Sequence, residues 1–187
     1  MDIAVYSGTF HPMHTGHLSI LDYLVREGFF GEVHLVVSPR NPFKDSAYAL
    51  SAEDRFRAAQ KAVARHPELL GKVVVNDIEL KMPPPSYTIR TLDALRSARP
   101  GDSFTLIMGG DNLAGILNWK EGARLLTDYG VAVYPRRGFD SQALRESLLG
   151  ISPAFRISLL DAPMVDISAT EIREGLAAGK DMSAFLM

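Results

Sequence analysis

Three of the five histidines in the 187-residue chain, His11, His14 and His17, fall within seven positions. They follow a short apolar run and precede a segment with helical periodicity. Gly8 and Gly16, in the same stretch, let the backbone approach a ligand closely, and a helix beginning near Gly16 would present free N–H groups to an anion. Imidazole N–H groups would add further donors. The spacing therefore predicts a phosphate-binding loop.

Two other interpretations of this stretch stay open. The histidines could be incidental residues of a tight strand-to-helix turn, or they could ligate a metal ion. No H-E-x-x-H pattern or obvious flanking carboxylate accompanies them, which disfavours the metal site. The stretch also fits neither a Walker A loop nor a G-x-G-x-x-G fingerprint, so neither common dinucleotide motif applies.

A second polar segment lies near the other end of the chain, between Ile167 and Arg173. Ser168 and Glu171 have the spacing of a capping box and so predict the start of a helix. The hydroxyl groups of Ser168 and Thr170, the free N–H groups of the helix and the Arg173 guanidinium would offer donors to a polyphosphate. A helix cap followed by an exposed arginine is the plainer interpretation of the same residues.

The elements that must position these residues alternate along the chain. Short β-branched runs predict strands at 2–7, 32–38, 72–77, 103–109, 130–134 and 156–160. Helical periodicity predicts helices at 16–27, 52–66, 87–99, 111–127 (broken), 141–149 and 169–178. This alternation predicts an α/β fold with a Rossmann-like, doubly wound, mostly parallel sheet flanked by helices. Ligands bind such sheets beyond the carboxyl ends of the strands.

Length and composition fit a single domain over residues 1–187, with 47% hydrophobic and 22% charged residues. The net charge of −2 provides no general attraction for nucleic acid polymers or anionic membranes, and no apolar run is long enough to span a bilayer. The chain has no cysteine, which excludes thiolate metal sites. We expect no nucleic acid or membrane partner and a cytoplasmic location. The oligomeric state is left open, a homo-oligomer included.

Taken together, the two polar segments resemble a known superfamily. The segment Gly8–His17 resembles the G-x-F-x-P-x-H-x-G-H signature of nucleotidyltransferases related to class I aminoacyl-tRNA synthetases. The segment Ile167–Arg173 is similar to their second signature, I-S-S/A-T-x-x-R. In that superfamily the two signatures hold the phosphates of ATP from opposite sides. This chain has His11 where relatives usually have Asp or Asn, so the resemblance assigns His11 no role.

The middle of the chain resembles one family within that superfamily, the bacterial nicotinate mononucleotide adenylyltransferases. Residues 85–88 look like their P-S-Y-T segment. Residues 109–113, with Trp119 a few positions on, are similar to their G-x-D-x-L motif and the tryptophan that follows it. Arg136 and Arg137 correspond to their arginine-containing strand end.

The resemblance implies adenylyl transfer from ATP to nicotinate mononucleotide in NAD biosynthesis, with Mg²⁺ held by the substrate phosphates and no metal ligated by the protein. It implies catalytic roles for His14, His17 and Arg173. The implied ATP contacts are Gly8, Thr9, Phe10, Gly16, Lys44, Gly109, Asp111, Ile167, Ser168 and Thr170. The implied mononucleotide contacts are Tyr87, Thr88, Trp119 and Arg137, and Arg136 is an equal candidate to Arg137.

These implied contacts have physical rationales and plainer alternatives. Asp111 at a strand end can accept hydrogen bonds from ribose hydroxyls, and Trp119 offers a flat face to a pyridine ring. A lone tryptophan often only packs in a core, and an Asp after glycines often only caps a turn. Nicotinamide mononucleotide, phosphopantetheine and a non-catalytic nucleotide-binding module stay open as alternatives. The runs 55–57 and 61–65 are expected on solvated helix faces.

Overall fold

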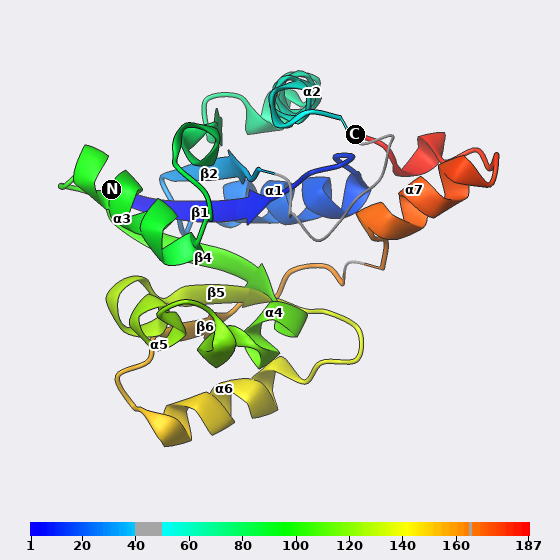
Figure 1. The fold of residues 1–187 in the computed structure, drawn as a ribbon. Helices are drawn as coiled ribbons and strands as arrows, with labels where there is room; N and C mark the ends of the chain where they lie inside the picture. The colour runs from blue at the N-terminus through cyan, green and yellow to red at the C-terminus, as the bar shows by residue number, and fades with distance from the viewer. Residues whose placement is uncertain (40–49, 165) are drawn as a thin grey trace.

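The computed structural model describes residues 1–39, 50–164 and 166–187. Within these ranges six parallel strands form one sheet in the order β3-β2-β1-β4-β5-β6 (Figure 1). The strands are β1 (Asp2–Gly8), β2 (Glu32–Val37), β3 (Val73–Asn76), β4 (Ser103–Gly109), β5 (Val131–Tyr134) and β6 (Ile157–Leu159). The predicted parallel sheet is confirmed, and each strand lies within one residue of its predicted bounds.

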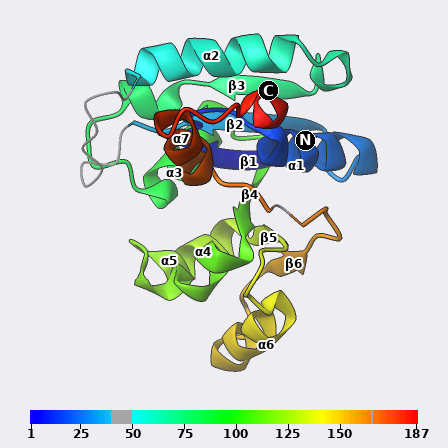
Figure 2. The same ribbon diagram turned by 90° about the vertical axis from the view of Figure 1, so that its right-hand side faces the viewer.

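Helices cover both faces of the sheet. On one face lie α1 (Thr15–Glu27) and α2 (Ala52–Ala64), and on the other α3 (Thr88–Ala98), α4 (Gly110–Ala114), α5 (Gly122–Arg124) and α6 (Ser141–Ile151) (Figure 1). The last helix, α7 (Ala169–Ala177), lies beyond the carboxyl end of β1, beside the start of α1 (Figure 2). Shorter turns are η1 (Pro67–Leu69), η2 (Ile78–Lys81), η3 (Ile116–Asn118), η4 (Leu125–Tyr129) and η5 (Ser183–Phe185). No helix in the described ranges is long and apolar enough to cross a membrane.

The central strand β1 shows how the core is divided. Successive side chains of a strand point to opposite faces. Ile3 and Val5 join the hydrophobic cluster under α3, α4 and α6, whereas Ala4 and Tyr6 join the cluster under α1 and α2. All four side chains are buried, as expected of a parallel strand covered on both faces.

The predicted break in the helix at 111–127 is confirmed. The segment divides into α4, η3, α5 and the π-helical turn η4. Gly122 allows α5 to pack closely against η3, because a Cβ at this position would collide with the carbonyl oxygen of Ile116. Trp119 follows η3 directly and has extended backbone angles, so it lies on a turn between short helices.

Candidate active site

The histidines of the first segment form the N-terminal cap of α1. The His14 Nδ1 accepts a hydrogen bond from the Gly16 N–H at 3.1 Å, and the His17 Nδ1 accepts one from the His14 N–H at 3.2 Å. The two rings stack with their centroids 3.6 Å apart. Because Nδ1 accepts in both rings, each neutral imidazole carries its proton on Nε2. The cap therefore leaves one N–H donor on each ring for a ligand.

Both imidazoles are neutral at neutral pH. Burial, followed by the nearby charge of Arg136, lowers the pKa of His14 from 6.5 to about 4. Burial, followed by the charges of His14 and Arg136, also lowers the pKa of His17 well below its ordinary value. The rings can thus donate hydrogen bonds while the formal positive charge at the site comes from arginine.

Phe10 supports His17 from within the protein. Its ring is 4% exposed and packs edge-on against His17, with centroids 5.0 Å apart, and against Tyr6 at 5.6 Å. A Cβ on Gly8 would lie 3.2 Å from the Phe10 ring, so the packing favours glycine at that position. Thr9, between them, is exposed. The structure thus puts the Phe10 side chain behind a histidine and leaves Thr9 at the surface of the loop.

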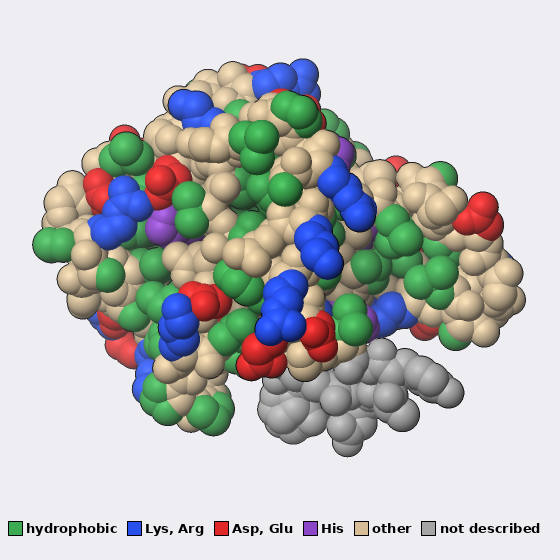
Figure 3. Space-filling model, turned by 90° about the horizontal axis from the view of Figure 1, so that it is seen from above, with side chains coloured by type: hydrophobic (Ala, Val, Ile, Leu, Met, Phe, Trp, Pro, Cys, Tyr) green, Lys and Arg blue, Asp and Glu red, His purple; other side chains and the backbone are tan. Residues whose placement is uncertain are grey.

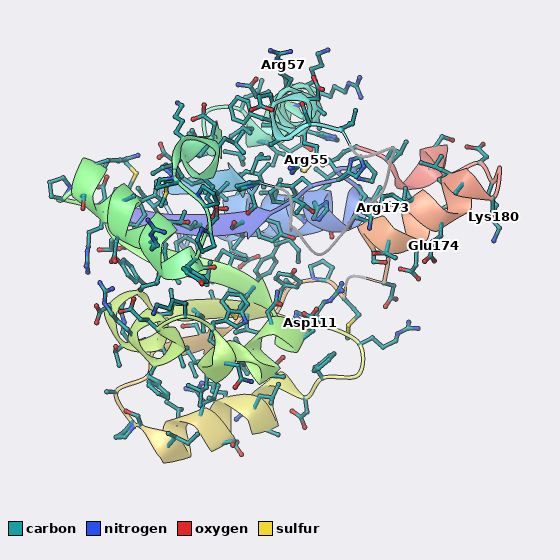
Figure 4. The ribbon with its side chains drawn as sticks, in the orientation of Figure 1. Arg55, Arg57, Asp111, Arg173, Glu174 and Lys180 are labelled. Carbon is teal, nitrogen blue, oxygen red and sulfur yellow. The ribbon has the colours of Figure 1, made fainter. Side chains whose placement is uncertain are left out.

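The second polar segment meets the first at the carboxyl end of β1. The predicted capping box is confirmed, because the Ser168 Oγ accepts from the Glu171 N–H at 3.2 Å and the Glu171 carboxylate accepts from the Ser168 N–H at 2.8 Å. Arg173 donates to the His11 carbonyl oxygen at 2.5 Å and to the Thr170 hydroxyl at 3.1 Å. One guanidinium, from the middle of α7, therefore links residues 162 positions apart (Figure 4).

A pocket lies between the ends of β4 and β5 and the start of α7, and we call it the Asp111 pocket. The Arg136 Nε lies 3.6 Å from the Asp111 carboxylate, and Arg137 forms an ion pair with Asp166 at 3.0 Å. The Arg136 side chain is 27% exposed and that of Arg137 80%. A Cβ on Gly109 would collide with the Asp111 carboxylate. The described lining is Asp111, Arg136, Arg137, Phe139, Asp166, Ile167, Ser168 and Glu171.

A second pocket, which we call the Trp119 pocket, lies between the start of α3 and the turn after η3. Its described lining is Ser86, Tyr87, Thr88, Asn118, Trp119 and Lys120. Tyr87 is the N-cap of α3 and makes no side-chain capping bond, so this end of α3 offers N–H groups to a ligand. Three of the four predicted mononucleotide contacts, Tyr87, Thr88 and Trp119, line this pocket together. Arg137 instead lines the Asp111 pocket.

Arg55 corrects one sequence-based expectation, since it does not lie on a solvated face of α2. Its side chain is 3% exposed, and its guanidinium donates to the carbonyl oxygens of Thr9 at 2.5 Å and Ser38 at 2.9 Å. In Figure 4 it points from α2 toward the sheet. The helical periodicity could have predicted the burial of Arg55, because Arg55 shares a helix face with the buried Ala59 and Ala62.

The other basic residues of α2 are exposed as predicted. Arg57, Lys61 and Arg65 follow one another at intervals of four and lie on the outer side of the helix. Figure 3, a view from above α2, shows basic side chains in a row across this face, and Figure 4 shows Arg57 pointing away from the molecule. This face of α2 is therefore solvated.

Two further expectations concern Lys44 and a metal. Lys44 lies outside the described residues, so its contact with ATP stays a prediction. Within the described part of the chain, no three His, Cys, Asp or Glu side chains gather as a metal site. His14 and His17 use Nδ1 to accept backbone hydrogen bonds, and the His11 carbonyl accepts from Arg173. The geometry of the loop thus favours an anion over a directly ligated metal.

Comparison with known proteins agrees with this arrangement. Residues 5–175 match the cytidylyltransferase-like family, and the chain belongs to that family. Within it, the chain groups with nicotinate-nucleotide adenylyltransferases. It is 37% identical to the probable enzyme of that name from Bacteroides fragilis over 97% of this chain and 85% of the relative, and 39% identical to the one from Cytophaga hutchinsonii over 92% and 84%.

A solved structure shares the fold. The nicotinic acid mononucleotide adenylyltransferase of Plasmodium falciparum, complexed with NaAD, superimposes with a TM-score of 0.80 at 20% identity. The match covers 97% of this chain and 87% of that one. The predicted family and the predicted fold class are both confirmed.

Proposed function

We propose that this protein transfers the adenylyl group of ATP to nicotinate mononucleotide, giving deamido-NAD and pyrophosphate. The observation that carries the proposal is the hydrogen bond from Arg173 to the His11 carbonyl, which joins the two predicted phosphate-binding segments. The Asp111 pocket and the Trp119 pocket offer space for the other parts of two nucleotides. The relatives' names support this acceptor.

The proposed reaction needs no side chain as a nucleophile. A phosphate oxygen of the mononucleotide attacks the α-phosphorus of ATP in line, and the bond from that phosphorus to the bridging oxygen breaks as pyrophosphate leaves. The Nε2–H groups of His14 and His17 would donate to the α- and β-phosphate oxygens. Ser168, Thr170 and Arg173 would hold the departing pyrophosphate. Catalysis would then consist of positioning and charge stabilisation.

The remaining contacts of the proposal follow from the two pockets. Asp111 would accept hydrogen bonds from ribose hydroxyls. In the Trp119 pocket, the indole would stack on the pyridine ring, and the N–H groups at Tyr87 and Thr88 would bind the nicotinate carboxylate. The buried Ser86 Oγ has no hydrogen-bond partner among the described residues, which leaves it available to the same ligand.

Mg²⁺ belongs to the proposal as a companion of the substrate. The described donors near the histidines are mainly N–H groups and hydroxyls, a set that suits phosphate oxygens better than a cation. Mg²⁺ commonly keeps several waters and binds through substrate phosphates. The ion would neutralise charge on the phosphates, while the protein's own donors orient them. Omission of Mg²⁺ should abolish turnover without unfolding the protein.

One assay tests the proposed function. Purified protein receives ATP and Mg²⁺ with nicotinate mononucleotide, nicotinamide mononucleotide or phosphopantetheine, and pyrophosphate release is measured. We expect much the highest kcat/KM with nicotinate mononucleotide. A higher value with another acceptor would replace the substrate in this proposal, and ATP binding without release for any acceptor would replace the activity itself.

Location and assembly stay predictions. A chain without cysteine suits a reducing compartment such as the cytoplasm. Sedimentation at several protein concentrations would test for a homo-oligomer.

A further inference from the structure

The two walls of the Trp119 pocket come from different parts of the chain. One wall is the start of α3, with Ser86, Tyr87 and Thr88, and the other is the turn that carries Asn118, Trp119 and Lys120. Both walls continue into helical segments, α3 on one side and α5 with η4 on the other. The width of the pocket therefore depends on what fixes these two segments to each other.

Asp93 joins them. Its carboxylate accepts two parallel hydrogen bonds from the Arg124 guanidinium, at 3.0 and 2.7 Å, and a third from the Tyr129 hydroxyl at 2.5 Å. Asp93 lies on α3, whereas Arg124 ends α5 and Tyr129 ends η4. We call these three residues the Asp93 clamp.

The clamp lies close to both walls along the chain. Asp93 is five residues beyond Thr88, a distance of about 7.5 Å along the axis of α3. Arg124 is five residues beyond Trp119, across one tight turn. A shift of either segment at the clamp is therefore carried to the pocket with little intervening chain to absorb it.

The exposure of the clamp indicates that it orients the two segments more than it stabilises the fold. The Asp93 and Arg124 side chains are 36% and 34% exposed, and exposed ion pairs contribute little to the free energy of unfolding. The paired geometry, however, restricts orientation as well as distance. Burial would raise the pKa of Asp93, but hydrogen bonds from Arg124 and Tyr129 outweigh burial and hold that pKa below its ordinary value. The carboxylate is therefore ionised at neutral pH.

We infer that Asp93, Arg124 and Tyr129 are positioning residues that set the spacing between Trp119 and the start of α3, and so govern affinity for the mononucleotide without touching it. This inference rests on the proposed function for the identity of the ligand. The positioning role itself does not depend on the ligand, because it is inferred from the hydrogen bonds that the Asp93 carboxylate of α3 accepts from Arg124 of α5 and Tyr129 of η4.

The test uses Asp93→Asn, which keeps the size of the side chain and removes its charge. The apparent KM for nicotinate mononucleotide should rise roughly fivefold or more, while the KM for ATP changes less than about twofold. Trp119 is the only tryptophan, so its fluorescence reports on the pocket wall directly. Quenching of that fluorescence by acrylamide should increase in the same variant, with no substrate present.

Three further variants complete the design. Asp22→Asn is the matched control, because Asp22 pairs with Arg26 at 2.6 Å within α1 alone, and it should change neither readout. Tyr129→Phe removes only the hydroxyl that donates to Asp93. If Asp93→Asn folds poorly, Tyr129→Phe replaces it in both measurements, with the same direction of change expected.

Arg124 also pairs with Asp128 at 3.0 Å and Glu121 at 3.4 Å, both within its own segment. Asp93→Asn combined with Arg124→Met should therefore raise the mononucleotide KM by less than the product of the two single effects, since both single changes break the shared bond between the segments.

The outcomes separate this inference from the proposed function. Unchanged quenching, or equal rises in the KM values of ATP and the mononucleotide, would overturn the clamp even in an active enzyme. A wild-type protein that prefers another acceptor would overturn the proposed substrate, and the quenching of Trp119 in the clamp variants would still decide the positioning role.

Discussion

His14 and His17 each serve the backbone and a ligand at once. Their Nδ1 atoms accept hydrogen bonds at the start of α1, which leaves Nε2–H groups directed by the fold. The sequence predicted that these histidines belong to a phosphate loop from their spacing between glycines. It could not predict their stacking or their lowered pKa values, because both depend on burial against Phe10 and on Arg136, which is distant in the sequence.

The role of His17 is testable by His17→Ala. Loss of one preorganised donor to the phosphates should lower kcat by roughly a hundredfold or more, while the variant stays folded by circular dichroism. The half-buried His66, outside both pockets, supplies the control variant His66→Ala, which should keep wild-type turnover. Near-normal turnover of His17→Ala would remove His17 from the catalytic proposal.

Trp119 allows a test of substrate contact against core packing. Its ring is partly buried against the hydrophobic cluster and also lines a pocket. Trp119→Ala should raise the KM for nicotinate mononucleotide by roughly tenfold or more, because stacking and apolar contact are lost, and should change the KM for ATP much less. Steady-state kinetics with each substrate varied separately provides the measurement. Similar increases for both substrates would indicate that the tryptophan only supports the core.

At the scale of elements, α2 supports the phosphate loop through one buried side chain. Arg55 satisfies carbonyl groups at the end of β2 and in the loop after β1, while Arg57 is 73% exposed with one ion pair at 3.8 Å. Arg55→Met keeps the apolar stem but leaves both carbonyls without this donor. We expect a loss of about 1–3 kcal/mol in the free energy of unfolding, together with a higher KM for ATP.

Arg57→Met is the matched comparison on the same helix. An exposed residue of this kind should change the free energy of unfolding by less than about 0.5 kcal/mol. Urea denaturation of both variants provides the measurement. Equal stability of the two variants would show that the buried hydrogen bonds of Arg55 do not hold the loop.

Elements with clear periodicity were predictable, and those shaped by close contacts were less so. The alternation of apolar residues gave the strands and the long helices within a few residues. Between residues 110 and 129, the sequence predicted only that the helix breaks. The pieces there are set by contacts such as Gly122 against the Ile116 carbonyl and Tyr129 against Asp93, which join residues whose proximity no local pattern reveals.

At the scale of the whole molecule, the arrangement of the sheet followed from general rules, whereas the composition of each pocket did not. Parallel βαβ units place the carboxyl ends of the strands at one edge, so the two signature segments were expected to meet there. The sequence alone did not indicate that Arg137 and Trp119 line different pockets. Each of the two lines its pocket with residues distant in the sequence, Arg137 with residues 166–168 and Trp119 with residues 86–88, and no local pattern reveals such neighbours.

Global stability should depend on pH through His14. Its pKa is about 4 in the folded chain and near 6.5 when unfolded, so the unfolded chain binds a proton first as the pH falls. The free energy of unfolding should therefore decrease from about pH 6.5 to about pH 4, with His14 contributing on the order of 3 kcal/mol. His14→Asn, which keeps a good capping residue without a titrating ring, should show a smaller decrease in urea denaturation. Identical pH profiles would contradict the burial of a neutral His14.

The bond between Arg173 and the His11 carbonyl also has a consequence for biosynthesis. A ribosome makes His11 162 residues before it makes Arg173. Until α7 emerges, a nascent chain can form the cap of α1 and yet lacks the guanidinium that meets it. Both halves of the phosphate site therefore exist only after α7 has been translated, and a prematurely terminated chain that ends before α7 should be catalytically inactive.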